Sequence, residues 1–281
     1  MIKSIFKIPK ELLPQVKEKY PFVYLEKGRI EVDDRSIKFI NSENEVISIP
    51  CGIINCILLS HGTSITHEAI KILSEYNCNV FWVGEQGIHF YAYGLTPTHD
   101  TRNFMIQCEL SCNSETRLII AKKLFKYRFP NDDVSNKTLN QLMGMEGKRV
   151  KNQYIFYSEK YNIKCDYRNE HITEFEEQDV TNKYLTIFNQ FLYAILCSAT
   201  ISMGYSPHIG FIHKSSPLPF IYDMSDLYKE KLCIEPAFRL ASKFGIYDEI
   251  VAKDEFIKNI IEIDLLKKYT EDLTKLFEEY K

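Results

Sequence analysis

In the first 95 positions, hydrophobic residues alternate with polar ones or form short apolar runs, which is the pattern of β-strands. The runs are rich in β-branched and aromatic residues and are separated by short polar or glycine-containing breaks. The run 53–60 is apolar almost throughout, so it predicts a strand covered on both faces. One short helix is predicted at 67–76, with Thr66 as its cap. The predicted strands are 22–26, 29–32, 36–41, 45–49, 53–60, 79–84 and 89–94, the last two forming a closing pair.

From Arg102 onward the apolar positions follow the helical period. The polar stretch 95–101 contains a proline and separates the two patterns, so a domain boundary is expected there. The sequence therefore predicts an α+β fold, with a β-rich domain at 1–95 followed by an all-helical domain at 96–281. The predicted helices are 104–126, 139–161, 181–204, 236–244, 254–263 and 265–280.

The segment 184–204 is long and largely apolar, which raises the question of a membrane span. Asn189 and Gln190 interrupt it, and unpaired amides in lipid would be costly. No basic cluster flanks it closely. We expect a helix buried inside the fold and no membrane association.

The net charge and the spacing of the cysteines restrict the kinds of partner, metal site and cellular compartment that the chain fits. The net charge of −3 gives no global attraction to nucleic acid, so such binding would need a local basic patch. The eight cysteines include no Cys-x-x-Cys pair, which argues against a structural zinc knuckle. The chain shows no secretory start, and free thiols in a reducing cytoplasm are the simplest expectation.

Candidate chemistry is concentrated in the stretch 204–229. His213 follows one apolar run, and Asp223 and Asp226 follow the next. If a helix begins near Asp223, both carboxylates lie on one face, and together with the imidazole they form a candidate divalent-metal site. The alternative is that Asp223 caps a helix with an acidic first turn and His213 is an ordinary loop or core histidine.

A third acid, Glu146, lies between Gly144 and Gly147 within a predicted helix. Helix propensity does not favour two glycines there, so the pair can indicate close approach of another backbone or of a ligand. Lys148 and Arg149 follow directly and could hold an anion beside a bound metal. The alternative is an ordinary acid on a helix surface.

Several motifs, taken together and in order, resemble a known family. They are MEG-x-R at 145–149, IGFIH at 209–213, PLPFIYDMSD at 217–226 and the long match at 67–94. The chain resembles the CRISPR-associated spacer-acquisition integrase, the larger of the two adaptation proteins, in the form found with Cascade-type systems. The similarity runs over nearly the whole chain.

The resemblance implies a β-sandwich-like domain for dimerisation and partner binding, followed by a helical catalytic domain. It implies Glu146, His213 and Asp226 as metal ligands, with Asp223 as a further acid that supports the catalytic site. Mg²⁺ or Mn²⁺ is the implied cofactor. The implied partners are pre-spacer DNA and the CRISPR array, a second copy in a homodimer, and a small ferredoxin-like protein. The reaction would be attack of a DNA 3′-hydroxyl on a phosphodiester, which a divalent ion assists by lowering the pKa of the hydroxyl.

DNA would be held through its backbone, because captured fragments differ in sequence. The expected phosphate contacts are Lys148, Arg149, Lys214 and Lys229, with Arg168 and Lys253 added by rough alignment. The chain departs from its relatives at His89 and Met143, where they often carry basic residues, and it lacks the long C-terminal tail of some of them. Two alternatives remain, a free-standing structure-specific DNA nuclease and a catalytically silent DNA-binding scaffold.

Overall fold

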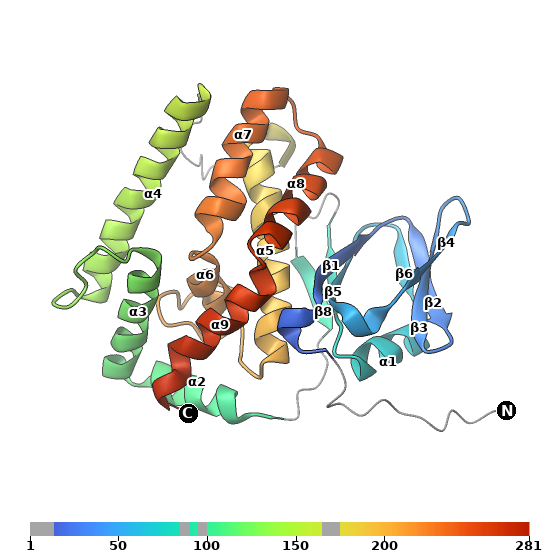
Figure 1. The fold of residues 1–281 in the computed structure, drawn as a ribbon, viewed down its shortest axis with the longest axis horizontal. Helices are drawn as coiled ribbons and strands as arrows, with labels where there is room; N and C mark the ends of the chain where they lie inside the picture. Colours follow the sequence, from blue (N-terminus) through green and yellow to red (C-terminus); the bar gives the residue numbers. More distant parts are fainter. Residues whose placement is uncertain (1–13, 85–89, 95–99, 165–174, 281) are drawn as a thin grey trace.

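The computed structural model describes residues 14–84, 90–94, 100–164 and 175–280, with the strands gathered at one end of the molecule and most helices at the other (Figure 1). All predicted strands are found within one or two residues of their expected bounds. A short strand, β6, was not predicted. The strands are β1 (Tyr20–Leu25), β2 (Gly28–Asp33), β3 (Ser36–Asn41), β4 (Val46–Ile49), β5 (Ile54–Leu59), β6 (Thr63–Ile65), β7 (Asn79–Val83) and β8 (Phe90–Gly94).

The described strands form two four-stranded sheets. In one, the order is β1-β5-β7-β8, with β1, β5 and β7 parallel and β8 antiparallel to β7, which confirms the predicted closing pair. In the other, the order is β4-β3-β2-β6, antiparallel except for β6 alongside β2. Because β5 has a strand on each side and all six of its residues are buried, it is the doubly covered strand that its apolar run predicts.

The two sheets pack against each other together with α1 (His67–Glu75). Ile30, Phe39, Ile57 and Leu73 belong to this core. As predicted, Thr66 caps α1, its side chain accepting a hydrogen bond from the backbone N–H of Ala69. The other face of the β1-β5-β7-β8 sheet belongs to the larger core that includes the helices. This sheet therefore joins the β-rich part to the helical part, and the predicted α+β class is confirmed.

The helical part differs from the prediction at its first helix and at the predicted helix 254–263, which in the structure already begins at Glu249. The predicted helix 104–126 is two helices, because Asn113 leaves the helical conformation and its side chain caps the second one. The predicted helix 139–161 is confirmed. The longer helices are α2 (Arg102–Cys112), α3 (Ser114–Arg128), α4 (Leu139–Tyr161), α5 (Val180–Ser202), α6 (Pro219–Ser225), α7 (Glu235–Phe244), α8 (Glu249–Glu262) and α9 (Leu265–Phe277). A π-helix lies at Glu230–Ile234, and 3₁₀ turns lie at Val16–Glu18, Cys51–Ile53, Phe175–Glu177 and Glu278–Tyr280.

Helix α5 runs through the middle of the molecule (Figure 1). By length and composition it could cross a membrane, yet 72% of its most apolar stretch is buried inside the fold. It packs against β5, α6, α7 and α9, and Ser198 on it donates a 2.9 Å hydrogen bond to the backbone oxygen of Asn55 in β5. This is the buried core helix that the sequence predicts.

Candidate functional site

Two acids that are distant in the sequence meet at one guanidinium group. Arg128 ends α3, Glu146 lies in the middle of α4, and Asp226 directly follows α6. The Nη1 of Arg128 is hydrogen-bonded to Oε1 of Glu146 and lies 3.5 Å from Oδ2 of Asp226. The side chains of Arg128, Glu146 and Asp226 are only 10%, 15% and 14% exposed. Their charges are therefore poorly screened by solvent.

A second cation, Lys229, completes this cluster, and we call Arg128, Glu146, Asp226 and Lys229 together the Arg128 group. The Nζ of Lys229 lies 2.8 Å from Oδ1 of Asp226 and 5.1 Å from the centre of the Tyr193 ring. Burial would raise the pKa of Asp226, but Lys229 and Arg128 outweigh it and lower that pKa. Burial likewise opposes the charge of Lys229, but Asp226 raises the pKa of Lys229 above its usual value. Asp226 is therefore an ionised carboxylate held between two cations.

Asp223 serves a different purpose from Asp226. Its fully buried carboxylate accepts hydrogen bonds from the backbone N–H groups of Phe211, Ile212 and His213 at 2.6, 3.0 and 2.9 Å. Its Oδ1 also lies 2.7 Å from Nδ1 of His213. In the neutral imidazole this bond places the proton on Nδ1 and leaves Nε2 as the nitrogen available to a ligand. Asp223 is thus a positioning residue that fixes both the loop and the ring of His213.

The hydrogen bond to Asp223 raises the pKa of His213 above its ordinary value, and burial acts in the opposite direction. Asp226 adds to the increase, so His213 and Asp226 lie close enough to influence each other. The imidazole is half-buried and packs edge-on against the ring of Tyr222, with 6.1 Å between ring centres.

The loop that carries His213 is held from α2 and α3. Buried Gln107 donates to the backbone oxygens of Ser206 and Ile209 at 3.0 and 2.8 Å and accepts from the N–H of Ser206. Arg117 donates to the backbone oxygen of Phe211 at 2.7 Å. A Cβ atom on Gly210 would overlap the backbone oxygen of His213 and would lie 2.8 Å from Cβ of Pro219, so the loop requires glycine there.

The predicted helix start near Asp223 is wrong. Helix α6 begins at Pro219, Asp223 lies inside it, and Asp226 is its C-cap. Proline at the first helical position favours this earlier start, since its missing N–H would have no partner there in any case. Asp223 and Asp226 remain three positions apart in helical conformation, as the predicted shared face requires, but they have different partners: Asp223 holds the His213 loop, and Asp226 contacts Arg128 and Lys229.

The structure brings Glu146 and Asp226 together at one cation and places His213 nearby. In the described ranges, no three His, Cys, Asp or Glu side chains are close enough as they stand to hold a metal ion. The donor set nevertheless fits Mg²⁺ or Mn²⁺. The carboxylates of Glu146 and Asp226 converge on the guanidinium of Arg128, which occupies the place of a cation. His213 binds Asp223 through Nδ1 and therefore keeps Nε2 free for a metal ion. A Cβ atom on Gly144 or Gly147 would meet nothing within 4 Å, so the chain itself leaves space beside Glu146.

The predicted phosphate contacts differ in their surroundings. Lys148 and Lys214 are exposed and make no ion pair with the described residues. Arg149 pairs with Asp132, and Lys229 is largely buried against Asp226. Lys253 pairs with Glu249 on α8 and stacks on Tyr24 of β1, outside the Arg128 group. Arg168 and His89 lie outside the described residues, and Met143 is exposed on α4.

Sequence reasoning missed Arg128, the residue that links the two acids. It follows a run of lysines and aromatics at the end of a predicted helix, where an arginine is unremarkable as a helix-terminal cation. No local signal distinguishes it from Lys126.

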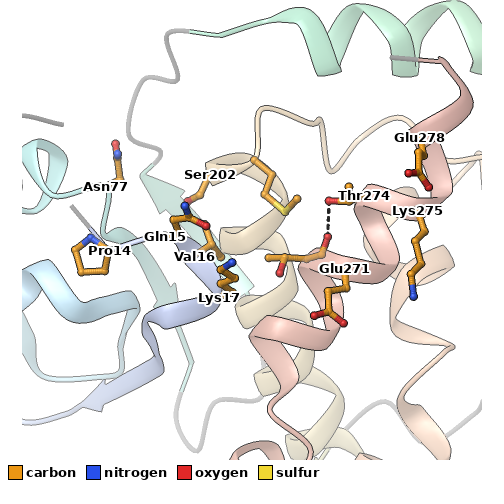
Figure 2. Close-up of a pocket in the computed structure, with 12 residues that line it drawn as sticks. Pro14, Gln15, Val16, Lys17, Asn77, Ser202, Glu271, Thr274, Lys275 and Glu278 are labelled. Atoms are coloured by element: carbon orange, nitrogen blue, oxygen red, sulfur yellow. Dashed lines mark hydrogen bonds between the residues drawn. The ribbon is translucent and has the colours of Figure 1, made fainter. Parts of the chain in front are cut away.

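A cavity of about 650 Å³ lies elsewhere, between the segment 14–17, the end of α5 and the helix α9 (Figure 2). Its lining mixes Lys17 and Lys275 with Glu271 and Glu278, and none of the predicted site residues contributes to it. This cavity is therefore separate from the group around Arg128.

Comparison with known proteins extends over most of the chain. A family model described as CRISPR associated protein Cas1 matches residues 22–135 and 130–279. The chain is 52% identical over 270 residues to CRISPR-associated endonuclease Cas1 2 of Chlorobaculum tepidum, which covers 96% of this chain and 91% of that protein. It is 34% identical over 238 residues to CRISPR-associated endonuclease Cas1 of a Clostridium species, covering 85% of this chain and 79% of that one. A solved structure described as a TtCas1-DNA complex matches with a TM-score of 0.70 and 31% identity, over 94% of this chain and 99% of that chain.

Proposed function

This chain belongs to the family of CRISPR-associated protein Cas1, and from that premise we propose that it is a divalent-metal-dependent integrase and endonuclease that inserts captured DNA into the CRISPR array. The resemblance drawn from the motifs is confirmed at the level of the family. The similarity to CRISPR-associated endonucleases supports a nuclease activity. The metal, the joining reaction and the roles of individual residues belong to the proposal.

One observation carries the proposal. Glu146 and Asp226 come from different helical segments, yet both carboxylates converge on a single positive group, and His213 lies close enough to Asp226 for that acid to raise its pKa. A cation between two buried carboxylates offsets their mutual repulsion, so this arrangement is suited to binding one. In the proposed reaction a divalent ion bound here would lower the pKa of the attacking hydroxyl and neutralise charge on the phosphate.

The residues of the chain have distinct parts in this proposal. Glu146, Asp226 and His213, through Nε2, are the proposed metal ligands. Asp223 fixes the orientation of the imidazole through Nδ1, the nitrogen that does not bind the metal, as the carboxylate partners of metal-binding histidines commonly do. Gln107 and Gly210 fix the loop that brings His213 to the site.

DNA binding is supported by the similarity to the TtCas1 protein, whose structure is described as a DNA complex. Lys148 and Lys214 are the best available phosphate contacts among the predicted cations, because both are exposed and lack an acidic partner among the described residues. Arg149 and Lys253 would first have to leave Asp132 and Glu249. We further propose a cytoplasmic homodimer that works with a small ferredoxin-like partner.

A strand-transfer assay tests this function. Pre-spacer duplex with free 3′-hydroxyl ends is incubated with the protein, its small partner, Mn²⁺ and a supercoiled plasmid carrying the array. We expect joined product with the natural chain, and loss of joining with retained DNA binding in Glu146→Ala, His213→Ala and Asp226→Ala. Unchanged joining in all three variants would reject the assigned site.

The same assay separates the alternatives. Metal-dependent cleavage of branched DNA without any joined product would favour a free-standing nuclease, in which water is the nucleophile. DNA binding without cleavage or joining would favour a silent scaffold.

A further inference from the structure

Arg128 lies in the space where the two proposed carboxylate ligands converge. Its Nη1 is hydrogen-bonded to Glu146 and lies 3.5 Å from Asp226, and its side chain is 10% exposed. An ion coordinated by both carboxylates needs that same space. A guanidinium and a divalent ion cannot share it, because they would overlap and would also repel each other strongly at such short distances.

We propose that Arg128 is an internal counter-cation that holds Glu146 and Asp226 together and must withdraw when a divalent ion binds, so that ion binding is an exchange. This inference rests on the metal site of the proposed function. In this inference the guanidinium of Arg128 competes with the metal ion for the two carboxylates. Neither the motifs nor the comparisons indicate this role.

The charges around the site support an exchange rather than a simple addition. Arg128 and Lys229 face Glu146 and Asp226, and the acid Glu230 also lies close enough to Arg128 to act on its charge. A divalent ion added beside both cations would raise the positive charge of a largely buried place by two, which is costly. Withdrawal of Arg128 removes one of the positive charges and so lowers this cost.

The position of Arg128 in the chain allows such a movement. It is the last residue of α3, and the next residue, Phe129, has already left the helical conformation. Its guanidinium lies 5.1 Å from the centre of the Phe129 ring, against which it packs. Arg149 packs on the same ring at 4.8 Å but pairs with Asp132. Arg149 is therefore a matched control with the same chemistry and the same aromatic neighbour, but no contact with either proposed ligand.

The exchange is tested by titrating Mn²⁺ into the full chain and measuring free Mn²⁺ by electron paramagnetic resonance. We expect Arg128→Gln to bind Mn²⁺ about tenfold more tightly than the natural chain, because the ion no longer has to displace a charged guanidinium from the two carboxylates. Arg149→Gln should change the affinity by no more than about twofold, because its charge is paired elsewhere. A purely structural role for Arg128 predicts the opposite sign, since loss of structure weakens binding.

Thermal unfolding gives a second readout. With chelator present, Arg128→Gln should melt at a lower temperature than the natural chain, because the two carboxylates lose their shared partner. Saturating Mn²⁺ should remove this difference. Equal or weaker Mn²⁺ affinity in Arg128→Gln, or failure of that variant to fold even in saturating Mn²⁺, would overturn the exchange.

Glu146→Gln distinguishes this inference from the proposed function. If Mn²⁺ binding by the natural chain does not depend on Glu146, the proposed metal site itself is wrong. If binding depends on Glu146 but Arg128→Gln does not tighten it, the metal site stands and only the exchange fails.

Discussion

The carboxylate of Asp223 and the imidazole of His213 are joined by a 2.7 Å hydrogen bond between Oδ1 and Nδ1. The same carboxylate also accepts a hydrogen bond from the backbone N–H of His213 and so holds the loop that carries the ring. Asp223 is fully buried and receives three consecutive backbone N–H groups. The direction of the His213 ring is consequently fixed by an acid that does not itself face solvent or the Arg128 group.

Substitution of Asp223 by Asn should destabilise the fold strongly. Its Oδ2 accepts from both Phe211 and Ile212, and an amide NH₂ in that place would face two donors. We expect the free energy of unfolding to fall by about 2–4 kcal/mol in urea denaturation. Asp179→Asn is the matched control, because Asp179 is a helix cap at which asparagine serves equally well, so its loss should stay below about 0.5 kcal/mol. Equal losses in the two variants would contradict the role of Asp223.

The pKa of His213 should be higher than that of an ordinary histidine, because its imidazole is hydrogen-bonded to Asp223. A pKa raised by folding means that the protonated ring stabilises the fold. This contribution is fully present below the unfolded pKa of about 6.5 and is lost as the pH rises through the higher folded value. An NMR titration with chelator present should give a His213 pKa above about 6.5 and a lower one in Asp223→Asn. An unchanged pKa in that variant would contradict the assignment.

Substitution of Gly210 by Ala should disturb the loop that carries His213. The added Cβ would overlap the backbone oxygen of His213 and approach Pro219 to 2.8 Å at its Cβ, and backbone atoms cannot move aside cheaply. We expect a loss of about 1–3 kcal/mol in the free energy of unfolding, measured by urea denaturation. A variant as stable as the natural chain would show that the loop adapts.

Substitution of Gly144 by Ala should have the opposite effect on stability. Gly144 lies inside α4, and a Cβ atom there meets nothing within 4 Å. Alanine in a helix interior is more favourable than glycine, so the free energy of unfolding should rise by about 0.5–1 kcal/mol. A loss of stability would mean that the glycine has a structural role within the folded chain.

Much of the fold follows from local patterns in the sequence. The alternation in the β-rich part sets the strands, and helix α4 begins and ends as predicted because Thr138 and Gln141 form a capping box and Asn162 adopts the left-handed conformation at its end. The break between α2 and α3 was predictable in principle, since Asn113 followed by Ser114 and Glu115 is a capping sequence.

The site was less predictable, because its geometry depends on tertiary contacts. The spacing of Asp223 and Asp226 places them near each other on a helix, but it does not show that Asp223 holds the His213 loop while Asp226 pairs with Lys229. Arg128 has no sequence signal, since its importance arises only when α3, α4 and the end of α6 come together. The motifs identified the acids and the histidine, but only the three-dimensional structure showed what each of them contacts.

The central claim is that Glu146, His213 and Asp226 together bind a divalent cation, and a crystal structure of the protein soaked in Mn²⁺ tests it most directly. The account predicts an anomalous peak between the two carboxylates, in contact with Nε2 of His213 and with the Arg128 guanidinium moved away. A well-occupied Mn²⁺ ion bound elsewhere, with Arg128 still bridging Glu146 and Asp226, would contradict it.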